Sequence, residues 1–433
     1  METTQKIQDK KTNTKLFPIY KMFSWDLLFY YSIIYLFLTQ AKNFSASEVL
    51  LAESFFTASC LLLQIPIGLL VDKIGKKNSL VFANICMCVF ITILLFVNNY
   101  PMLLLANFID AIGYVIKGVC ETNILYDSLP SGEKRGTLYS SVDGIGASRY
   151  YVIDAITSII AGITFTIDPY IPVVLCLIVN IIALILSTRF KHTQSQREEE
   201  NLKETAKQYF KELKEAIKFT FNSKRMLCLM LFFGLMSGLT YNLSTYRSNI
   251  LNSINIPAQY FGIIFAIIQI MAGICSKGQG WLHKRFKNNT LSVLGIPYVA
   301  SCFIIGCLVD SFGESVSNIV VILFILQGAI KGAYNVLIYR YLNNFTNRKI
   351  RVKLATIRNM FFNMISILIS LLGSFLLKVT TSGNTFLIVG GICTVCMVLL
   401  LDYMRGKVGL KPEKYNKEDL KYSSFNEGGN LKW

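Results

Sequence analysis

The amino-acid sequence predicts an all-α membrane protein with twelve transmembrane helices arranged as two six-helix bundles. Three observations support this class. The chain of 433 residues is 53% hydrophobic, which is more than an ordinary soluble domain carries. Apolar runs of about 20 residues, the length that crosses a bilayer as a helix, recur along it. Lysine and arginine are concentrated in every second link between these runs.

The apolar runs are interpreted as helices because the strands of a membrane β-barrel would be shorter and would alternate in polarity. In the first half of the chain, the expected helix cores are 19–40, 49–71, 79–98, 101–127, 137–166 and 170–189. In the second half, they are 226–247, 258–277, 290–309, 317–340, 352–378 and 384–404. Residues 1–15 are polar and lack the apolar core of a signal peptide, so the first run is expected to direct membrane insertion.

Loop charges orient the predicted helices. The basic links contain Lys73/Lys76/Lys77, Lys134/Arg135, Lys284/Arg285/Lys287 and Arg348/Lys349/Arg351. The intervening links, such as residues 98–100 and 252–259, contain no lysine or arginine. Basic links stay in the cytoplasm, which predicts a multi-pass protein of the plasma membrane with both termini cytoplasmic. The formal net charge of +17 is explained by these links and tails, so the expected partner is the lipid bilayer and not nucleic acid.

The two halves of the chain repeat each other at offsets near half its length. The matches are residues 116–118 with 330–332, residues 135–138 with 351–354, and residues 76–80 with 287–291. Three matches indicate two homologous halves. The predicted domains are an N-terminal bundle (1–190), a cytoplasmic linker (191–225), a C-terminal bundle (226–405) and a cytoplasmic tail (406–433).

The linker contains an amphipathic stretch at 202–221, which predicts a cytoplasmic helix lying at the membrane surface. A passive linker is the favoured interpretation, and a regulatory or partner-binding role stays open. All 11 cysteines fall inside apolar runs, which fits neither a disulfide framework nor a zinc site. No metal and no cofactor are therefore expected.

The link between the second and third runs has a distinctive pattern of glycine and charge. The residues are Gly68, Asp72, Lys73, Gly75, Lys76 and Lys77. The glycines permit a sharp turn and close helix approach, and the lysines keep the turn in the cytoplasm. The aspartate is costly at this depth unless a cation or a helix N-terminus meets it.

This loop, the twelve spans, the duplication and the long central link resemble the major facilitator superfamily over about residues 17–405. The resemblance implies alternating access and a cytoplasmic gate in which Asp72 meets the N-terminus of the eleventh span near 351–353. In the second half, His283 stands in the position of Asp72 and Phe286 in that of Gly75. Only one strong latch is therefore expected.

Some features bear on the subtype. Span four has Lys117 where drug exporters of the superfamily usually have an arginine motif, and span five lacks their proline at 143–149. Residues 125–129 and the Lys-Pro-Glu tail resemble permeases of low-GC Gram-positive bacteria. The resemblance therefore includes drug- or multidrug-efflux-like permeases, with these departures.

Charges inside spans are expensive, so they are functional candidates. The candidates for proton coupling or for lining the cavity are Asp26, Asp110, Lys117, Glu121, Asp143, Arg149 and Asp154. Helical spacing places Asp110, Lys117 and Glu121 on one face. Two clusters are predicted: Lys117 with Asp143, Glu121 or Asp26, and Arg149 with Asp110 or Asp154. Fixed ion pairs that only join helices are the alternative.

The second half offers bases, with no acid deep within its spans. The candidates for the substrate cavity are Tyr30 from span one and Tyr241, Asn242, Lys331, Tyr334, Asn335 and Arg358, with Arg247 as a further base. First-half acids are expected to take up protons, while second-half bases hold an anionic group or pair with those acids in one conformation. Protonation would then bias the alternating-access equilibrium.

These features predict a secondary active transporter, with proton-coupled efflux of small amphipathic organic compounds as the leading hypothesis. Its expected partners are a small-molecule substrate and protons, and it is expected to act as a monomer. Proton-coupled uptake of a polar nutrient such as a sugar or peptide is the alternative within transport. A substrate sensor that does not transport is a third hypothesis. An enzyme is not expected, because the sequence has no nucleophile or metal cluster and no phosphate-binding loop.

Overall fold

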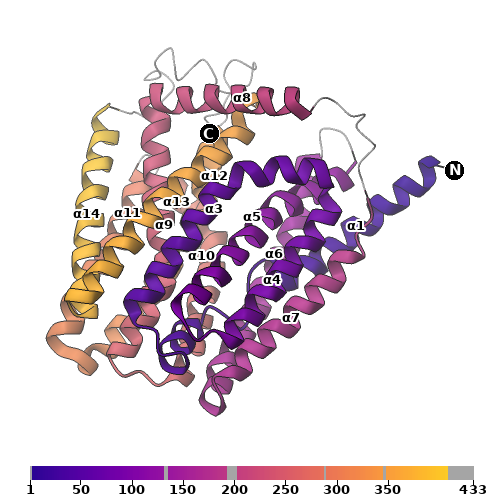
Figure 1. Ribbon diagram of the computed structural model, residues 1–433. Helices are drawn as coiled ribbons and strands as arrows, with labels where there is room; N and C mark the ends of the chain where they lie inside the picture. The colour runs from indigo at the N-terminus through magenta and orange to yellow at the C-terminus, as the bar shows by residue number, and fades with distance from the viewer. Residues whose placement is uncertain (1, 131–134, 193–201, 287–288, 345–347, 408–433) are drawn as a thin grey trace. The chain divides into compact units, whose positions relative to one another are not determined.

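The computed structural model describes residues 2–130, 135–192, 202–286, 289–344 and 348–407, and these residues form helices joined by short links. The chain divides into two compact units. Unit 1 comprises residues 1–199 and 256–267, and unit 2 comprises residues 200–255 and 268–433. The helices, which Figure 1 labels, confirm the predicted all-α membrane class.

Unit 1 contains the first six expected spans. Its elements are α1 (Glu2–Ser24), α2 (Ile34–Leu36), the π-helix η1 (Phe37–Ala41), α3 (Ala46–Ile74), α4 (Lys76–Phe96), α5 (Tyr100–Ser128), α6 (Arg135–Ile167) and α7 (Tyr170–Thr188). Local sequence explains several boundaries. Ser45 and Glu48 form a capping box at the start of α3, and the Asn99 side chain caps α5. Gly75, at φ +90°, lies between α3 and α4, where its missing Cβ permits the sharp turn.

Unit 2 contains the remaining elements, except that residues 256–267 at the start of α10 group with unit 1. These elements are α8 (Leu202–Asn222), α9 (Lys224–Ser253), α10 (Ala258–Phe286), α11 (Thr290–Phe312), the 3-10 turn η3 (Gly313–Val316), α12 (Ser317–Asn344), α13 (Arg348–Val379) and α14 (Ser382–Lys407). Within this unit, α9 packs on α13 and α11 packs on α14.

The first expected span, 19–40, is not one continuous helix. It breaks at residues 25–33, which we call the break. The Asp26 carboxylate accepts the Leu27 N–H at 2.9 Å and the Tyr31 hydroxyl at 2.6 Å. Phe29 has a left-handed φ of +62°. An aspartate that bonds its own neighbours in this way competes with helix hydrogen bonding, a local effect that hydropathy does not reveal.

The break explains part of the span count. Ten stretches in the described residues are long and apolar enough to cross a membrane. One of them, Thr290–Asn335, covers both α11 and most of α12 and therefore contains two expected spans. The first span is missing from the ten because its two parts are separated. Together these two facts reconcile the ten stretches with twelve expected spans.

The linker helix α8 buries part of its surface against unit 2. Leu213, Ala216 and Phe219 are buried, and the helix packs on α9 and α13. Figure 1 shows α8 lying crosswise to α9. The helix was predicted, and its position at the membrane surface stays a prediction. Phe221, next to its last residue, is 61% exposed.

Candidate functional site

The C-terminal end of α1, just before the break, is held by two charged side chains of α5. The Lys117 ammonium donates to the Ser24 carbonyl, and Ser24 Oγ donates to Glu121 Oε1 at 3.3 Å. Lys117 and Glu121 are four residues apart, so they share one face of α5. A helix end leaves carbonyl groups without intrahelical partners, and a cation is favourable there. Lys117 therefore acts as a side-chain cap for α1.

A second contact joins α1 to α6. Lys21 Nζ lies 2.5 Å from Asp143 Oδ1, and the same ammonium lies 4.5 Å from the centroid of the Trp25 ring. The Lys21 stem passes close to Gly146, where a Cβ atom would meet the Cβ and Cδ atoms of Lys21 at 3.0 Å. Glycine at position 146 therefore allows the lysine to reach Asp143 along the surface of α6.

Lys21 is a functional candidate that the sequence analysis missed. Asp143 was one of three expected partners for Lys117, with Glu121 and Asp26 as the others. Asp143 pairs with Lys21, whereas Lys117 binds the end of α1 and its charge acts on Glu121. Lys21 lies only two residues inside the start of the expected first span, where a lysine is typical of a cytoplasmic flank. The available signal was its spacing: Lys21 and Trp25 are four residues apart and share a helix face.

The expected pairing of Arg149 with Asp154 is absent from the ion pairs of the described residues. Arg149 is exposed, whereas Asp154 is buried with 6% of its surface accessible. Five residues along an α-helix rotate the side chain by about 140°, so the two groups lie on different sides of α6. Asp143 and Asp154, eleven residues apart, do share a face, as predicted. Asp110 is half-buried on α5, where the charges of Asp26 and Lys117 act on it.

The basic loop between α3 and α4 forms one recorded ion pair, between Lys76 and Asp127 at the end of α5. This contact lies within unit 1. Lys73 is exposed and Lys77 is half-buried, while Gly68 has open space where a Cβ atom would stand. The side chains of Asp72 and of residues 351–353 lie outside the described part of the chain, so the cytoplasmic latch stays a prediction.

Two of the polar candidates in unit 2, Asn242 and Tyr334, form hydrogen bonds between helices. Asn242 Nδ2 donates to Ser366 Oγ at 2.9 Å, and the Ser370 hydroxyl donates to Asn242 Oδ1. The Tyr334 hydroxyl lies 3.3 Å from Ser237 Oγ. Asn242 and Tyr334 are fully buried. Both side chains hold helices together in this conformation, and their place on a substrate path stays a prediction.

The bases of unit 2 lie against aromatic rings. The Arg247 guanidinium lies 5.2 Å from the Phe324 ring centroid, and the Arg358 guanidinium lies 5.2 Å from that of Phe233. Cation–π contact compensates part of the cost of burying a positive charge. The remaining cavity candidates, Tyr241, Lys331 and Asn335, are half-buried. Tyr241 packs edge-on against Phe362 with ring centroids 5.7 Å apart.

The comparisons with known proteins identify the family. The profile of the Major Facilitator Superfamily matches residues 16–317 and 292–426, which together include most of the chain. This chain belongs to the major facilitator superfamily. It is a multi-pass membrane protein and a secondary transporter of the type that defines this superfamily. No curated protein matches the sequence.

Solved structures of other superfamily members have the same fold. The nucleoside transporter NupG is 12% identical, with a TM-score of 0.67 over 93% of this chain and 99% of that one. The D-xylose-proton symporter is 13% identical, with a TM-score of 0.64 over 91% and 96%. A POT family transporter in complex with 5-aminolevulinic acid is 12% identical, with a TM-score of 0.62 over 92% and 95%. At these identities the likeness shows the fold alone.

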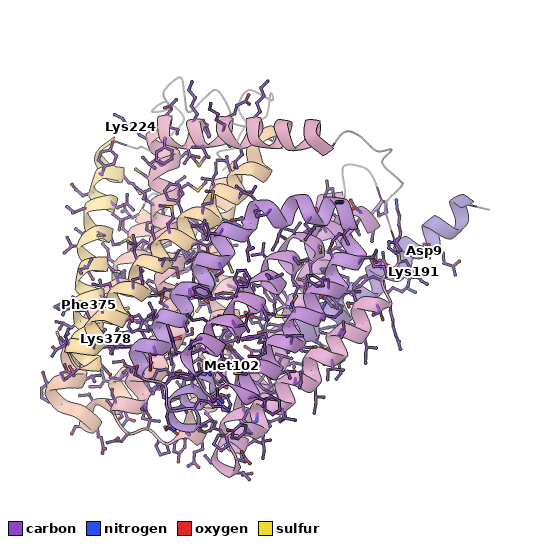
Figure 2. The ribbon with its side chains drawn as sticks, in the orientation of Figure 1. Asp9, Met102, Lys191, Lys224, Phe375 and Lys378 are labelled. Carbon is purple, nitrogen blue, oxygen red and sulfur yellow. The ribbon has the colours of Figure 1, made fainter. Side chains whose placement is uncertain are left out.

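A further residue outside the predicted set, Asn13, joins α1 to the ends of two other helices of unit 1. The Asn13 amide Nδ2 donates to the Lys191 carbonyl at 3.0 Å and to Ser128 Oγ at 3.3 Å, and Asn13 Oδ1 accepts the Lys191 N–H at 2.8 Å. Figure 2 labels Asp9 and Lys191 at this end of unit 1. Asn13 thus ties α1 to the ends of α5 and α7.

Replacing Asn13 with alanine should destabilise the protein by about 2 kcal/mol, because the change removes the three hydrogen bonds that this buried side chain forms with Lys191 and Ser128. The measurement is the thermal unfolding midpoint in detergent. Asn98→Ala is the matched control, since Asn98 is exposed and bonds only its neighbour Asn99. A midpoint that falls equally for both variants would contradict the role of Asn13.

Proposed function

We propose that this superfamily member exports small amphipathic organic compounds in exchange for protons, in the manner of the drug-efflux-like permeases it resembles. The observation that carries the proposal is the charged network around the end of α1. In it, the Asp143 carboxylate pairs with Lys21 of α1, and the Glu121 carboxylate accepts a hydrogen bond from Ser24 at the end of α1. Proton uptake at these carboxylates would loosen the contacts that hold α1 to α5 and α6.

The coupling follows from differential protonation. With Asp143 ionised, the Lys21 ammonium is attracted to α6, whereas a protonated Asp143 retains only a hydrogen bond. The state in which the pair is open therefore binds protons more tightly than the state in which it is closed, and proton binding shifts the equilibrium toward the open state. A substrate that prefers the closed state would be driven by the proton gradient.

The proposal includes the cellular setting. The basic links favour a plasma-membrane protein with both termini in the cytoplasm, acting as a monomer with residues 1–190 and 226–405 as its two transport bundles. Residues 191–225 join the bundles, and residues 406–433 form the tail. In this orientation the network at the end of α1 lies in the cytoplasmic half of the membrane.

Uptake of a polar nutrient is the second candidate function, and the polar compounds named for the similar solved structures favour it. These are described as transporters of nucleosides and of D-xylose with protons, and as a POT family transporter in complex with a thioalcohol-conjugated peptide. Fold likeness at such low identity does not transfer a substrate, so the network within unit 1 carries the proposal.

The experiment uses proteoliposomes that contain the pH-sensitive dye pyranine. Ethidium and rhodamine 6G test efflux, and uridine, D-xylose and dialanine test uptake. We expect the dyes, but not the nutrients, to move protons through the wild-type protein. Asp143→Asn should reduce this flux at least tenfold, while Asp168→Asn, a change in an exposed link, should not. Proton flux driven only by a nutrient would select uptake, and none with any compound would favour a sensor.

A further inference from the structure

We propose that the break in the first span and the adjoining face of α6 form a binding site for the cationic group of an organic ammonium compound. The inference rests on the proposed function and deepens it by naming the substrate class. The site consists of two groups of aromatic rings, Trp25 with Tyr150 and Tyr151 and Tyr30 with Tyr31, together with the nearby carboxylates. We call it the aromatic cage.

The rings of the aromatic cage come from two elements that meet in unit 1. Trp25 packs edge-on against Tyr150 and Tyr151, with centroids 5.2 and 5.1 Å apart. Tyr30 packs edge-on against Tyr31 at 5.2 Å. Trp25, Tyr30 and Tyr31 are half-buried and Tyr151 is 39% exposed, so each of these rings keeps part of its surface accessible. Aromatic faces attract cations through the ring quadrupole, and quaternary ammonium groups are recognised in this way.

The cage already accepts a positive charge. The Lys21 ammonium lies 4.5 Å from the Trp25 ring centroid while Asp143 neutralises it. A ring face that holds the ammonium of the protein itself in this geometry has the position and orientation that an external ammonium group needs.

Carboxylates converge on the same rings. The phenol of Tyr30 interacts electrostatically with Asp26, Glu53 and Asp110, and that of Tyr150 interacts with Asp26 and Asp154. The Tyr31 hydroxyl donates to Asp26 directly. Carboxyl groups from the break, α3, α5 and α6 therefore lie around the cage. Glu53, in the second expected span, was also missed by the sequence analysis.

The balance of charge favours a cation over an anion. Within the predicted spans of unit 1, apart from their last residues, the acids are Asp26, Glu53, Asp110, Glu121, Asp143 and Asp154, and the bases are Lys21, Lys117 and Arg149. Lys21 is matched by Asp143, and Lys117 caps α1 beside Glu121. The acids near the cage thus outnumber the remaining base, Arg149, and an organic cation would reduce this excess.

The broken main chain supplies the third element. Irregular backbone at membrane depth is tolerated where it lines a cavity or a ligand site, because lipid cannot satisfy its polar groups. Within the break, Phe29 adopts a left-handed φ of +62°, a conformation that is costly for a bulky residue and occurs preferentially at functional sites. Ser32 Oγ is buried and has no hydrogen-bond partner among the described residues. These are features of a site that a ligand completes.

Trp25 provides a direct probe, since the sequence has three tryptophans. Replacing the other two with phenylalanine, as Trp281→Phe and Trp433→Phe, leaves Trp25 as the reporter. The probes are phenyltrimethylammonium and its neutral isostere tert-butylbenzene, titrated against the purified full chain in detergent. We expect saturable quenching by the cation and at least tenfold weaker binding of the isostere. Equal affinity for the two probes, or no binding of either, overturns the inference.

Two substitutions test the parts of the cage. Tyr151→Leu should weaken binding of the cation at least fivefold, whereas Tyr403→Leu, at a tyrosine of similar exposure on α14, should not. Lys21→Met should tighten binding at least threefold, because it removes the competing ammonium and exposes the charge of Asp143. A gain in affinity cannot come from misfolding. No change with Tyr151→Leu, or weaker binding with Lys21→Met in a variant that melts cooperatively, overturns the inference.

The outcome is distinguishable from that of the proposed function. Binding is measured without a proton gradient. Proton flux with dyes but no binding of phenyltrimethylammonium would support the proposed function and contradict the aromatic cage. Binding of the cation without proton-driven flux would support the aromatic cage and contradict the proposed function.

Discussion

Replacing Lys21 with glutamate should reduce proton-driven transport at least 100-fold. The change places two carboxylates where Lys21 and Asp143 now lie 2.5 Å apart. Two neighbouring carboxyl groups cannot both ionise without strong repulsion. Breaking a buried ion pair destabilises a protein by about 3–5 kcal/mol, and the effect is smaller here because the Asp143 side chain is 29% exposed. The measurement is the initial rate of pyranine response in proteoliposomes with ethidium as substrate.

The exchanged pair is the rescue for this variant. Lys21→Asp combined with Asp143→Lys restores the opposite charges, and the rate should recover at least tenfold over Lys21→Glu. Asp168→Asn, the change in an exposed link, is the control, and its loss should stay below fivefold. An exchanged pair as inactive as the single variant would show that the two residues do not act together.

Replacing Lys117 with methionine should destabilise the protein by about 3–5 kcal/mol. The Ser24 carbonyl would lose its donor at the end of α1, and the charge of Glu121 would lose a neighbouring cation. Methionine keeps the length of the side chain, so the change in packing is small. The measurement is the free energy of unfolding in detergent, or the shift in the thermal midpoint where unfolding is irreversible.

A double substitution separates charge from packing. Lys117→Met with Glu121→Gln removes both charges together, and it should regain at least half of the lost stability. Lys331→Met provides a control at the equivalent position of the second half, since residues 330–332 repeat 116–118. Lys331 is half-buried, and its loss is expected to cost less. Simple additivity of the two changes in unit 1 would rule out the network around Ser24.

Hydropathy and loop charge were sufficient to predict the helical elements because burying apolar surface in lipid is additive along the chain. Most expected cores fall within helices of the structure, among them 49–71 in α3 and 170–189 in α7, apart from its last residue. The break in the first span was not predictable in this way, since Asp26 forms it through hydrogen bonds to two specific neighbours.

The candidate site was partly predictable. Charged residues inside apolar runs identified Asp26, Lys117, Glu121 and Asp143, all of which lie at or near the end of α1 or at the break. Their partners were not predictable, because a pairing such as Lys21 with Asp143 joins residues 122 positions apart. Asp110 and Asp154 were the alternative partners expected for Arg149, but rotation about the α6 axis separates the side chains of Arg149 and Asp154.

The sequence by itself determined that the chain crosses the membrane many times as helices, and it indicated the superfamily to which the chain belongs. Both properties depend on sums over long segments and on a short loop pattern. Only the tertiary structure decided which charges meet, where the first helix breaks and which aromatic rings surround the break. The charge pairs and most of the ring contacts join helices distant in sequence, and the break depends on the hydrogen bonds of Asp26 to two specific neighbours. Both follow from three-dimensional geometry and not from composition.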